Sequence, residues 1–249
     1  MTPSTAPHAK QDALATAGLT VSFGGTRALK DFTMSVRTGE RVGLIGPNGA
    51  GKSTFINAVT GYTRSSGTIR FGGRQLRGMS PHRRARLGLV RTFQNLSLFG
   101  TMTVAENISL GLGRAGKRIP AKPENNADFN EVVALLGLER VVRTSVRDLP
   151  YGTRKLVELA RAMVSRPEVL LLDEPVAGLD TSEKARFVKS LRGALDALEC
   201  STVLVEHDMF TVEALTHRVY VLSSGAEIAE GPFSEVARDQ EVITAYLGA

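Results

Sequence analysis

Short apolar runs alternate with segments of helical spacing along most of this chain. Three of the runs are almost wholly apolar, which is typical of strands that are covered on both faces. These runs are Arg41–Ile45, Val169–Leu172 and Thr202–Val205. Segments of helical composition follow them at Phe55–Thr60, Ser182–Leu198 and Thr211–Ala214, and a further one lies at Leu156–Val164. This alternation predicts a mostly parallel α/β core.

Other patterns predict elements around that core. Weakly alternating runs next to glycine turns predict early strands at Ala17–Phe23, Phe32–Val36 and Ser66–Phe71. Helical spacing runs from Val104 to Arg147 around a loop at 111–126, and Ser234–Leu247 closes the chain as a helix. Val219–Leu222 and Ala226–Ala229 are expected to pair as a hairpin. We therefore expect an antiparallel β subdomain and an inserted helical subdomain beside the parallel core.

The 249 residues suffice for one large domain or two small ones. Residues 1–13 are rich in Pro, Ser, Thr and Ala and lack the apolar stretch of a secretory signal, so we interpret them as a disordered arm. Residues 14–249 then form a single domain, with the helical subdomain at about 97–165. The one cysteine, Cys200, excludes an internal disulfide and indicates a buried thiol in a reducing, cytosolic compartment.

The net charge of +6 raises the question of an anionic partner. The densest basic run contains Arg83, Arg84, Arg86 and Arg91, mostly within a helical segment at Pro81–Leu87. No aromatic residues are interleaved with these arginines, and no nucleic-acid motif accompanies them. We therefore interpret them as a solvated helix face in preference to a binding surface.

One segment matches the phosphate-binding pattern G-x-x-x-x-G-K-[ST], with an apolar strand before it and a helix after it. It reads Gly46, Pro47, Asn48, Gly49, Ala50, Gly51, Lys52 and Ser53. Its glycines allow backbone N–H groups to wrap an anion, and the helix N-terminus adds partial positive charge. Lys52 would reach the β- and γ-phosphates, Ser53 would ligate Mg²⁺, and Thr54 would add a phosphate hydrogen bond. The pattern predicts a nucleoside triphosphate site.

Acidic and imidazole side chains follow two of the other apolar strands. Asp173 ends one strand, where a carboxylate beside the phosphate loop can hold the metal. Glu174 comes next, where a carboxylate can take a proton from an attacking water. His207 follows the strand Thr202–Val205, at the edge where such sheets bind ligands, although position alone equally fits a half-buried histidine or a helix cap.

The phosphate loop, RTFQN, LPYG, LLLDEP, GLD and EHD occur in the order found in ABC transporter ATPases, and the chain resembles that family from about Gly18 to Gly248. The resemblance implies a P-loop NTPase (RecA-like) fold that hydrolyses ATP with Mg²⁺. It implies that Phe23 stacks on adenine and that His207 touches the γ-phosphate. It also implies that Gln94 contacts Mg²⁺ and the attacking water, and that Asp180 communicates between subunits.

The family's LSGGQ signature is replaced here by an altered segment. It reads Leu149, Pro150, Tyr151, Gly152 and Thr153, which departs from LSGGQ at three places. Pro150 cannot donate the hydrogen bond of the usual serine, but proline is tolerated in a first helical turn, and the Gly152 N–H remains available to an anion. The resemblance implies that this segment completes the ATP site of a second subunit, head to tail. We expect that sandwich to form with weaker closure.

Local features look most like the branched-chain amino acid importer ATPases. These features are FGG, RTFQN, LPYG, EHDM, IAEGP and the closing VITAYLG. The likeness implies membrane permease subunits as partners, a second ATPase subunit in a homodimer or paired heterodimer, and an extracytoplasmic solute-binding protein that acts indirectly. It implies a cytoplasmic location, peripheral on the inner face of the membrane, and no nucleic-acid partner.

Three other readings stay open at this point. The lipopolysaccharide-export ATPase has a similar tail but would carry a full LSGGQ signature. A soluble ABC-type factor acting on nucleic acid would carry long coiled coils or two such domains in one chain. A regulatory nucleotide sensor would not need Glu174 and His207, both of which are present.

Overall fold

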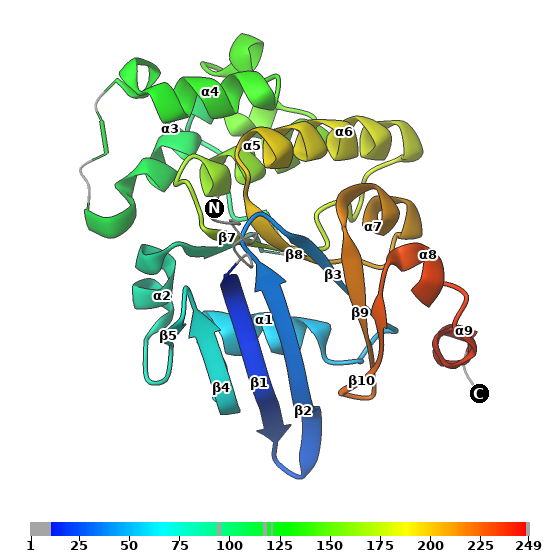
Figure 1. The fold of residues 1–249 in the computed structure, drawn as a ribbon. Helices are drawn as coiled ribbons and strands as arrows, with labels where there is room; N and C mark the ends of the chain where they lie inside the picture. Colours follow the sequence, from blue (N-terminus) through cyan, green and yellow to red (C-terminus); the bar gives the residue numbers. More distant parts are fainter. Residues whose placement is uncertain (1–10, 94–95, 117–118, 121, 248–249) are drawn as a thin grey trace, which may run out of the picture.

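The largest sheet contains the strands that the apolar runs form (Figure 1). The computed structural model describes residues 11–93, 96–116, 119–120 and 122–247, and this sheet has the strand order β10-β9-β3-β8-β7-β6. Its members are β3 (Arg41–Ile45), β6 (Leu89–Arg91), β7 (Val169–Asp173), β8 (Ser201–Val205), β9 (Arg218–Ser223) and β10 (Ala226–Gly231). All neighbours run parallel except the hairpin β9–β10, so the predicted parallel core is confirmed.

The first four residues of strand β7 are apolar because the strand is covered on both faces. Leu170 and Leu172 pack on one face of the sheet, in a cluster with helices α5 (Tyr151–Met163) and α6 (Thr181–Ala197). Val169 and Leu171 pack on the other face, in a cluster with helix α1 (Lys52–Thr60) and the second sheet. Because side chains alternate between faces, a strand buried on both sides is apolar along most of its length, and here only Asp173 at the end of β7 is polar.

The second sheet is antiparallel, with the order β2-β1-β4-β5. Its strands are β1 (Asp12–Phe23), β2 (Thr26–Arg37), β4 (Ser66–Phe71) and β5 (Arg74–Gln75). Phe32 of β2 meets Phe55 of α1 and Tyr220 of β9 edge-on, with ring centroids 5.4 and 5.9 Å apart. These aromatic contacts join the two sheets through α1, and the antiparallel β part of the predicted fold is confirmed.

The start of β1 corrects the predicted arm of residues 1–13. The strand begins at Asp12, where Ala13 and Leu14 are buried and Leu14 pairs with Phe71 of β4. The carbonyl of Gln11 accepts hydrogen bonds from the Thr38 amide and hydroxyl, at 3.1 and 3.0 Å. Two buried apolar side chains outweigh the polar composition of the segment. Residues 1–10 lie outside the described part of the chain.

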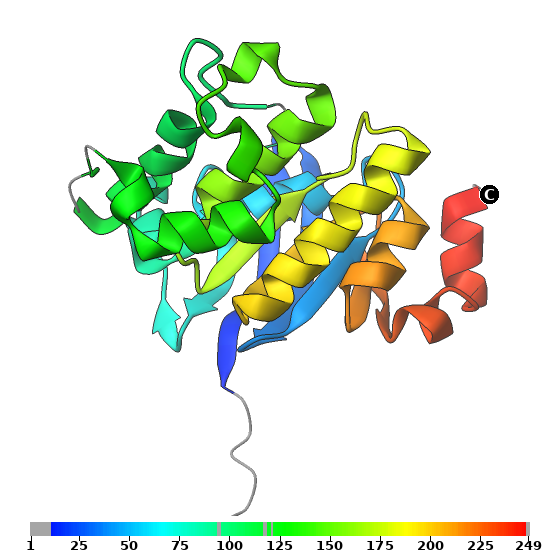
Figure 2. The ribbon, with the colours of Figure 1, turned by 90° about the horizontal axis from the view of Figure 1, so that it is seen from above.

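Short helices fill the stretch between β6 and β7, shown in green in Figures 1 and 2. They are α3 (Val104–Ser109), the 3-10 turns η1 (Leu110–Gly116), η2 (Pro123–Asn125), η3 (Glu139–Val141) and η4 (Val146–Asp148), α4 (Ala127–Leu135) and α5. The helical spacing from Val104 to Arg147 is therefore broken into pieces, and the expected loop at 111–126 contains two 3-10 turns. A capping box at Thr103 starts α3, and Asn126 caps α4.

Two further helix boundaries differ from the sequence predictions. Helix α5 begins at Tyr151, five residues before the predicted Leu156, because Pro150 occupies its N-cap. The closing helix is divided into α8 (Phe233–Val236) and α9 (Gln240–Leu247), because the Asp239 carboxylate accepts from the Glu241 and Val242 amides and starts a new helix. In the described part of the chain, no helix is long and apolar enough to cross a membrane.

The interpretation of the basic run as a solvated face is wrong for two of its members. Arg84 is buried in helix α2 (Pro81–Leu87), and its guanidinium donates to main-chain oxygens at 2.7 to 3.1 Å. The acceptors are Ala58, Val59, Leu76 and Met79. The first two end α1, so Arg84 supplies the positive charge that a helix C-terminus favours. Arg91 is also largely buried, whereas Arg83 and Arg86 are exposed.

Candidate active site

The phosphate loop leaves β3 and turns back on itself through residues with positive φ. Gly46 has φ +145°, and a Cβ there would lie 2.1 Å from the Leu222 carbonyl oxygen. Gly51 has φ +108°, and a Cβ there would lie 2.5 Å from the Ala28 carbonyl oxygen. Only glycine fits both requirements, so β9 and β2 hold the loop from two sides.

Lys52 is the first residue of α1, and its ammonium group is folded over the loop. Nζ donates to the carbonyl oxygens of Gly46 and Pro47, at 2.6 and 2.9 Å. Burial lowers the pKa of Lys52, and the nearby Glu174 and Asp173 carboxylates oppose part of that shift. The ammonium group therefore lies between the loop and the acidic side chains that follow β7.

The remaining loop residues leave the start of α1 open to an anion. Gly51 precedes the helix and offers no capping side chain, so the amides of the first turn keep their hydrogen-bonding capacity. Asn48, Gly49 and Ser53 are exposed, and Pro47 and Thr54 are half-buried. Ala50 is buried, and its carbonyl accepts from the Gly225 amide at 3.0 Å. The exposed side chains and the uncapped first turn therefore leave room for the predicted phosphate site, which stays a prediction.

Asp173 lies at the carboxyl end of β7, almost fully buried. Arg91, from the end of β6, places Nη2 3.6 Å from Oδ2 of Asp173 and donates from Nη1 to Asn57 Oδ1 of α1 at 2.7 Å. Burial raises the pKa of Asp173, while the Arg91 and Lys52 cations lower it and Glu174 and Glu206 raise it further. This contact was not predicted, because Arg91 belongs to the basic run that was interpreted as a solvated face.

Glu174 and His207 face each other across the ends of β7 and β8. Nδ1 of His207 lies 4.0 Å from Oε1 of Glu174, and the His207 side chain is 59% exposed. Glu174 has φ +48°, and its amide donates to the Val205 carbonyl at 2.9 Å. Because β8 lies between β3 and β7 in the sheet, the histidine that follows it stands between the phosphate loop and the acidic pair.

Glu206 was not singled out in the sequence, yet it is fully buried beside these residues. Its carboxylate accepts from the amides of Val176, His207 and Asp208 at 3.0 to 3.3 Å. Lys155 of α5 is also buried. Burial lowers its pKa, and the carboxylates of Glu158, Glu206 and Glu174 oppose part of that shift. An acid directly after a strand was the signal for Asp173 and could have indicated Glu206 as well.

The altered signature segment starts α5 and packs on the segment before α6. Leu149 is buried, and Pro150 is the N-cap of the helix, with the Arg154 amide donating to its carbonyl at 3.0 Å. Tyr151 is 41% exposed, and its hydroxyl donates to the Ala177 carbonyl at 3.5 Å. A Cβ on Gly152 would lie 3.3 Å from Oε1 of Glu183 in α6. The signature segment thus contacts the GLD segment of the same chain.

Three predicted site residues remain. Asp180 and Phe23 lie apart from the cluster around Lys52 and Glu174, and Gln94 lies outside the described residues. Asp180 is the N-cap of α6, where it accepts from the Ser182 and Glu183 amides at 2.8 Å, and those hydrogen bonds lower its pKa. Phe23 is 56% exposed at the end of β1, next to the hairpin turn into β2. Gln94 lies outside the described residues, so its two predicted roles have no geometry here.

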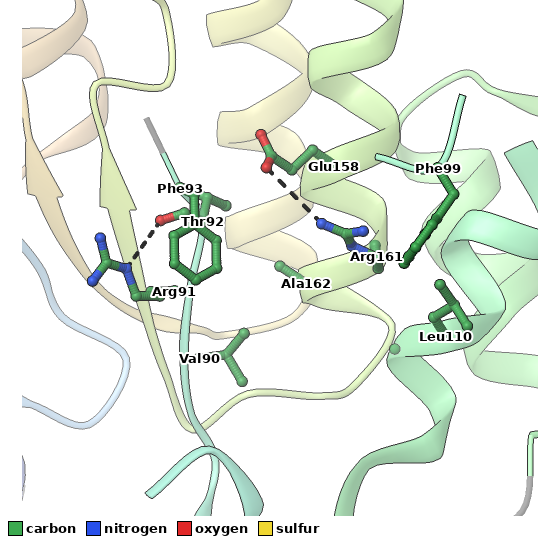
Figure 3. Close-up of a pocket in the computed structure, with 10 residues that line it drawn as sticks. Val90, Arg91, Thr92, Phe93, Phe99, Leu110, Glu158, Arg161 and Ala162 are labelled. Carbon is green, nitrogen blue, oxygen red and sulfur yellow. Dashed lines mark hydrogen bonds and ion pairs between the residues drawn. The ribbon is translucent and has the colours of Figure 1, made fainter. Parts of the chain in front are cut away.

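A cavity of about 360 Å³ opens between β6 and α5 (Figure 3). Phe93, Phe99 and Leu110 form its apolar wall. Glu158 and Arg161 of α5 also line it, with their charged groups 4.0 Å apart. The Arg91 guanidinium stacks over the Phe93 ring at 4.6 Å, so this groove is joined to Asp173 through one arginine.

The comparisons with known proteins agree with this geometry. The family model described as "ABC transporter" matches residues 29–177, and one described as "Branched-chain amino acid ATP-binding cassette transporter" matches residues 227–249. A crystal structure of a nucleotide-free ATP-binding cassette from an ABC transporter has a TM-score of 0.85 at 29% identity. It covers 96% of this chain and 100% of its own.

Two curated relatives match the chain nearly end to end. The high-affinity branched-chain amino acid transport ATP-binding protein LivG of Salmonella typhimurium is 37% identical, over 96% of this chain and 98% of its own length. The protein of the same description named BraF, from Pseudomonas aeruginosa, is 36% identical, over 94% of this chain and 97% of its own.

A phosphate loop beside an acidic strand end, on a parallel sheet with an antiparallel sheet against it, defines a P-loop ATPase of the ATP-binding cassette type. The chain belongs to the ABC transporter family. It is an ATP-binding and ATP-hydrolysing subunit, and such a subunit works with membrane permease partners.

Proposed function

We propose that this chain powers an importer of amino acids, most of all branched-chain amino acids, or of related small polar solutes. The observation that carries the proposal is the convergence of Lys52, Asp173, Glu174 and His207 at one edge of the sheet. The names of the similar LivG and BraF proteins, and the match of residues 227–249 to a branched-chain amino acid transporter model, support the choice of solute.

The phosphate loop would hold the ATP phosphates, with Lys52 moving from the loop carbonyls to the β- and γ-phosphates. Ser53 and Asp173 would hold Mg²⁺, together with phosphate oxygens and water. Hard oxygen donors of this kind fit Mg²⁺, which is usually bound by one or two carboxylates and substrate phosphates. No group of three or more acidic, histidine or cysteine side chains that could hold a metal occurs within the described residues. The ion would neutralise charge on the β- and γ-phosphates.

Glu174 would accept a proton from the attacking water, and His207 would contact the γ-phosphate. His207 Nδ1 lies 4.0 Å from Glu174 Oε1, and the His207 side chain is 59% exposed, so a phosphate could reach the imidazole beside the carboxylate. Gln94 would complete this set from the segment that follows β6, and Phe23 would offer its exposed ring to adenine.

A second ATPase subunit would complete the site, in a homodimer or a paired heterodimer. The segment from Leu149 to Gly152 would approach the partner's γ-phosphate with the Gly152 amide at the start of α5. Asp180 caps α6 two residues after Gly178, which packs against Tyr151. It would transmit conformational changes between the two ATP sites of the dimer. The groove lined by Phe93, Phe99 and Arg161 would receive the permease, on the cytoplasmic face of the membrane. A solute-binding protein outside the cell would act through that permease.

Purification of the intact complex from membranes tests this proposal directly. We expect permease subunits and a branched-chain amino acid binding protein among its components. In proteoliposomes that contain the complex, leucine should raise ATP hydrolysis, whereas an unrelated sugar should not. Export components for lipopolysaccharide, or the absence of permease subunits, would contradict the importer assignment.

A further inference from the structure

Glu206 occupies the first position after β8, directly before His207. Its side chain has 0% exposure, in contrast to the half-exposed histidine that follows it. Acidic side chains are almost never fully buried unless hydrogen bonds or charges compensate them. The contacts of this carboxylate therefore account for its presence in the core.

The two carboxylate oxygens of Glu206 bind the backbone of two different loops. Oε1 accepts from the Val176 amide at 3.1 Å, in the segment that follows Glu174. Oε2 accepts from the amides of His207 and Asp208, at 3.0 and 3.3 Å. One side chain thus fastens the loop after β7 to the loop after β8. These are the loops that present Glu174 and His207.

Hydrogen bonds to an ionised carboxylate are shorter and stronger than neutral ones, and a buried site strengthens them further. Oε2 of Glu206 also lies 3.8 Å from Nδ1 of His207, so the same carboxylate touches both the backbone and the ring of the histidine. Oε1 of Glu174 lies 4.0 Å from the same nitrogen, so both carboxylates approach one edge of the imidazole.

A compensating cation comes from a different element. Lys155 of α5 is buried and interacts electrostatically with Glu158, Glu206 and Glu174. Its ammonium group also lies 5.5 Å from the centroid of the Tyr151 ring, in the altered signature segment. The helix that begins with the signature thus supplies positive charge next to Glu206.

We propose that Glu206 is a positioning residue of the ATP site, which sets the distance between His207 and Glu174 by binding the backbone of both loops. The inference rests on the roles proposed above for His207 and Glu174. It predicts that Glu206 affects the rate of hydrolysis and leaves the binding of ATP nearly unchanged, because it contacts neither the phosphate loop nor Phe23.

Glu206→Gln is the variant that tests this role. A glutamine keeps one acceptor oxygen but turns an NH₂ group toward backbone amides, so one of the two loops is released. We expect kcat to fall on the order of 10- to 100-fold, as misplacement by about 1 Å does, with KM for ATP within about threefold. Glu213→Gln is the matched control, because Glu213 is exposed on helix α7 (Met209–Leu215), and it should match the wild type.

A double-mutant cycle separates positioning from general damage. In a His207→Ala background, Glu206→Gln should lower the single-turnover rate by less than about threefold, because one of the two groups whose separation it sets is already gone. An equal loss of rate in both backgrounds would overturn the inference, as would a rise in KM with unchanged kcat. Melting curves of each variant show whether it remains folded.

Hydrogen exchange tests the same contacts without relying on a variant that folds. In the wild-type protein the amides of Val176, His207 and Asp208 should be protected, and in Glu206→Gln at least one loop should exchange faster. Rapid exchange of all three amides in the wild type would refute the inference. If His207→Ala and Glu174→Gln retain full turnover, the proposed function fails. If only Glu206→Gln does so, this inference alone fails.

Discussion

Glu174 has a backbone conformation that most residues avoid. Its φ of +48° places a non-glycine residue in the left-handed region, which costs roughly 1–2 kcal/mol for an L-amino acid. The conformation is held by two hydrogen bonds, from the Glu174 amide to Val205 and from the Ala177 amide to the Glu174 carbonyl, at 2.9 and 3.2 Å. Strain of this kind accumulates where a side chain must point in one direction for function.

Replacing Glu174 with Gln keeps the size of the side chain and removes its ability to accept a proton. We expect ATP binding to stay within about threefold of the wild type, while turnover falls by at least 100-fold, in line with the usual contribution of a general base. Fluorescent nucleotide titration and phosphate release measure the two quantities. Persistent turnover would require another base at this edge of the sheet.

Cys200 should be unreactive in the folded protein. Burial raises the pKa of its thiol from 9.0 to about 11, and only the thiolate reacts with alkylating agents. At pH 8 the thiolate fraction is therefore about 100-fold lower than that of a thiol with pKa 9. Between pH 7 and 10 the rate of alkylation by iodoacetamide should rise about tenfold per pH unit without levelling. In urea the rate should level near pH 9, and levelling there in native buffer would contradict the shift.

Residues that form motifs could be predicted from the sequence, and residues that act through the fold could not. Lys52 and Asp173 stand at set distances from glycines or strand ends, so spacing alone indicates their chemistry. Arg91, Lys155 and Glu206 gain their partners from segments that are distant in sequence, such as Asn57 for Arg91 and Val176 for Glu206. Their burial and their partners depend on helix and strand packing, and only Glu206 had a local signal, its place directly after a strand.

At the scale of elements, α1 is the helix on which the site depends, and it is held at both ends. Its N-terminus follows the phosphate loop, and its last carbonyls accept from Arg84 of α2. The position of the first turn, where phosphates would bind, is therefore tied to a contact at the opposite end of the helix.

Replacing Arg84 with Met tests how much this contact stabilises the fold. Methionine preserves most of the apolar packing but removes the guanidinium hydrogen bonds to the carbonyl oxygens of Ala58, Val59, Leu76 and Met79. We expect a loss of about 2–4 kcal/mol in the free energy of unfolding, measured by urea titration. Arg83→Met on the exposed side of the same helix should change it by less than about 0.5 kcal/mol.

The buried strands were predictable within a residue or two, since burial on both faces leaves a clear apolar signature. The ends of the helices were harder to predict from the sequence. Helix α5 reaches back to Tyr151 through the N-cap Pro150, and Asp239 divides the closing helix in two. The basic run could not be assigned from spacing, because Arg84 sits among exposed arginines and its acceptors at the end of α1 lie 25 and 26 residues away.

At the scale of the whole molecule, the sheet order decides which loops meet. The parallel arrangement brings the ends of β3, β7 and β8 to one edge, which places the phosphate loop, the acidic pair and His207 together. The alternation of strands and helices predicted that arrangement. The order of the strands, with β8 between β3 and β7, depends on packing across the sheet and could not be predicted from the sequence.

The signature segment leads to a prediction about assembly. Its residues pack on Gly178 and Glu183 at the start of α6, and the proposed function assigns them to a second subunit's ATP. Hydrolysis by the purified chain should therefore rise more steeply than linearly with protein concentration, since a site needs two copies. Initial rates over a hundredfold dilution series measure this dependence, and a strictly linear relation down to dilute protein would contradict it.

The folded-back ammonium of Lys52 has a consequence for the nucleotide cycle. Because Nζ donates to the Gly46 and Pro47 carbonyl oxygens, the Lys52 ammonium group stabilises the shape of the loop before any phosphate binds. An incoming nucleotide must exchange those hydrogen bonds for its own, so its net affinity is the difference between two sets of bonds. After hydrolysis the Lys52 ammonium group can form its hydrogen bonds to Gly46 and Pro47 again, which favours the release of the product.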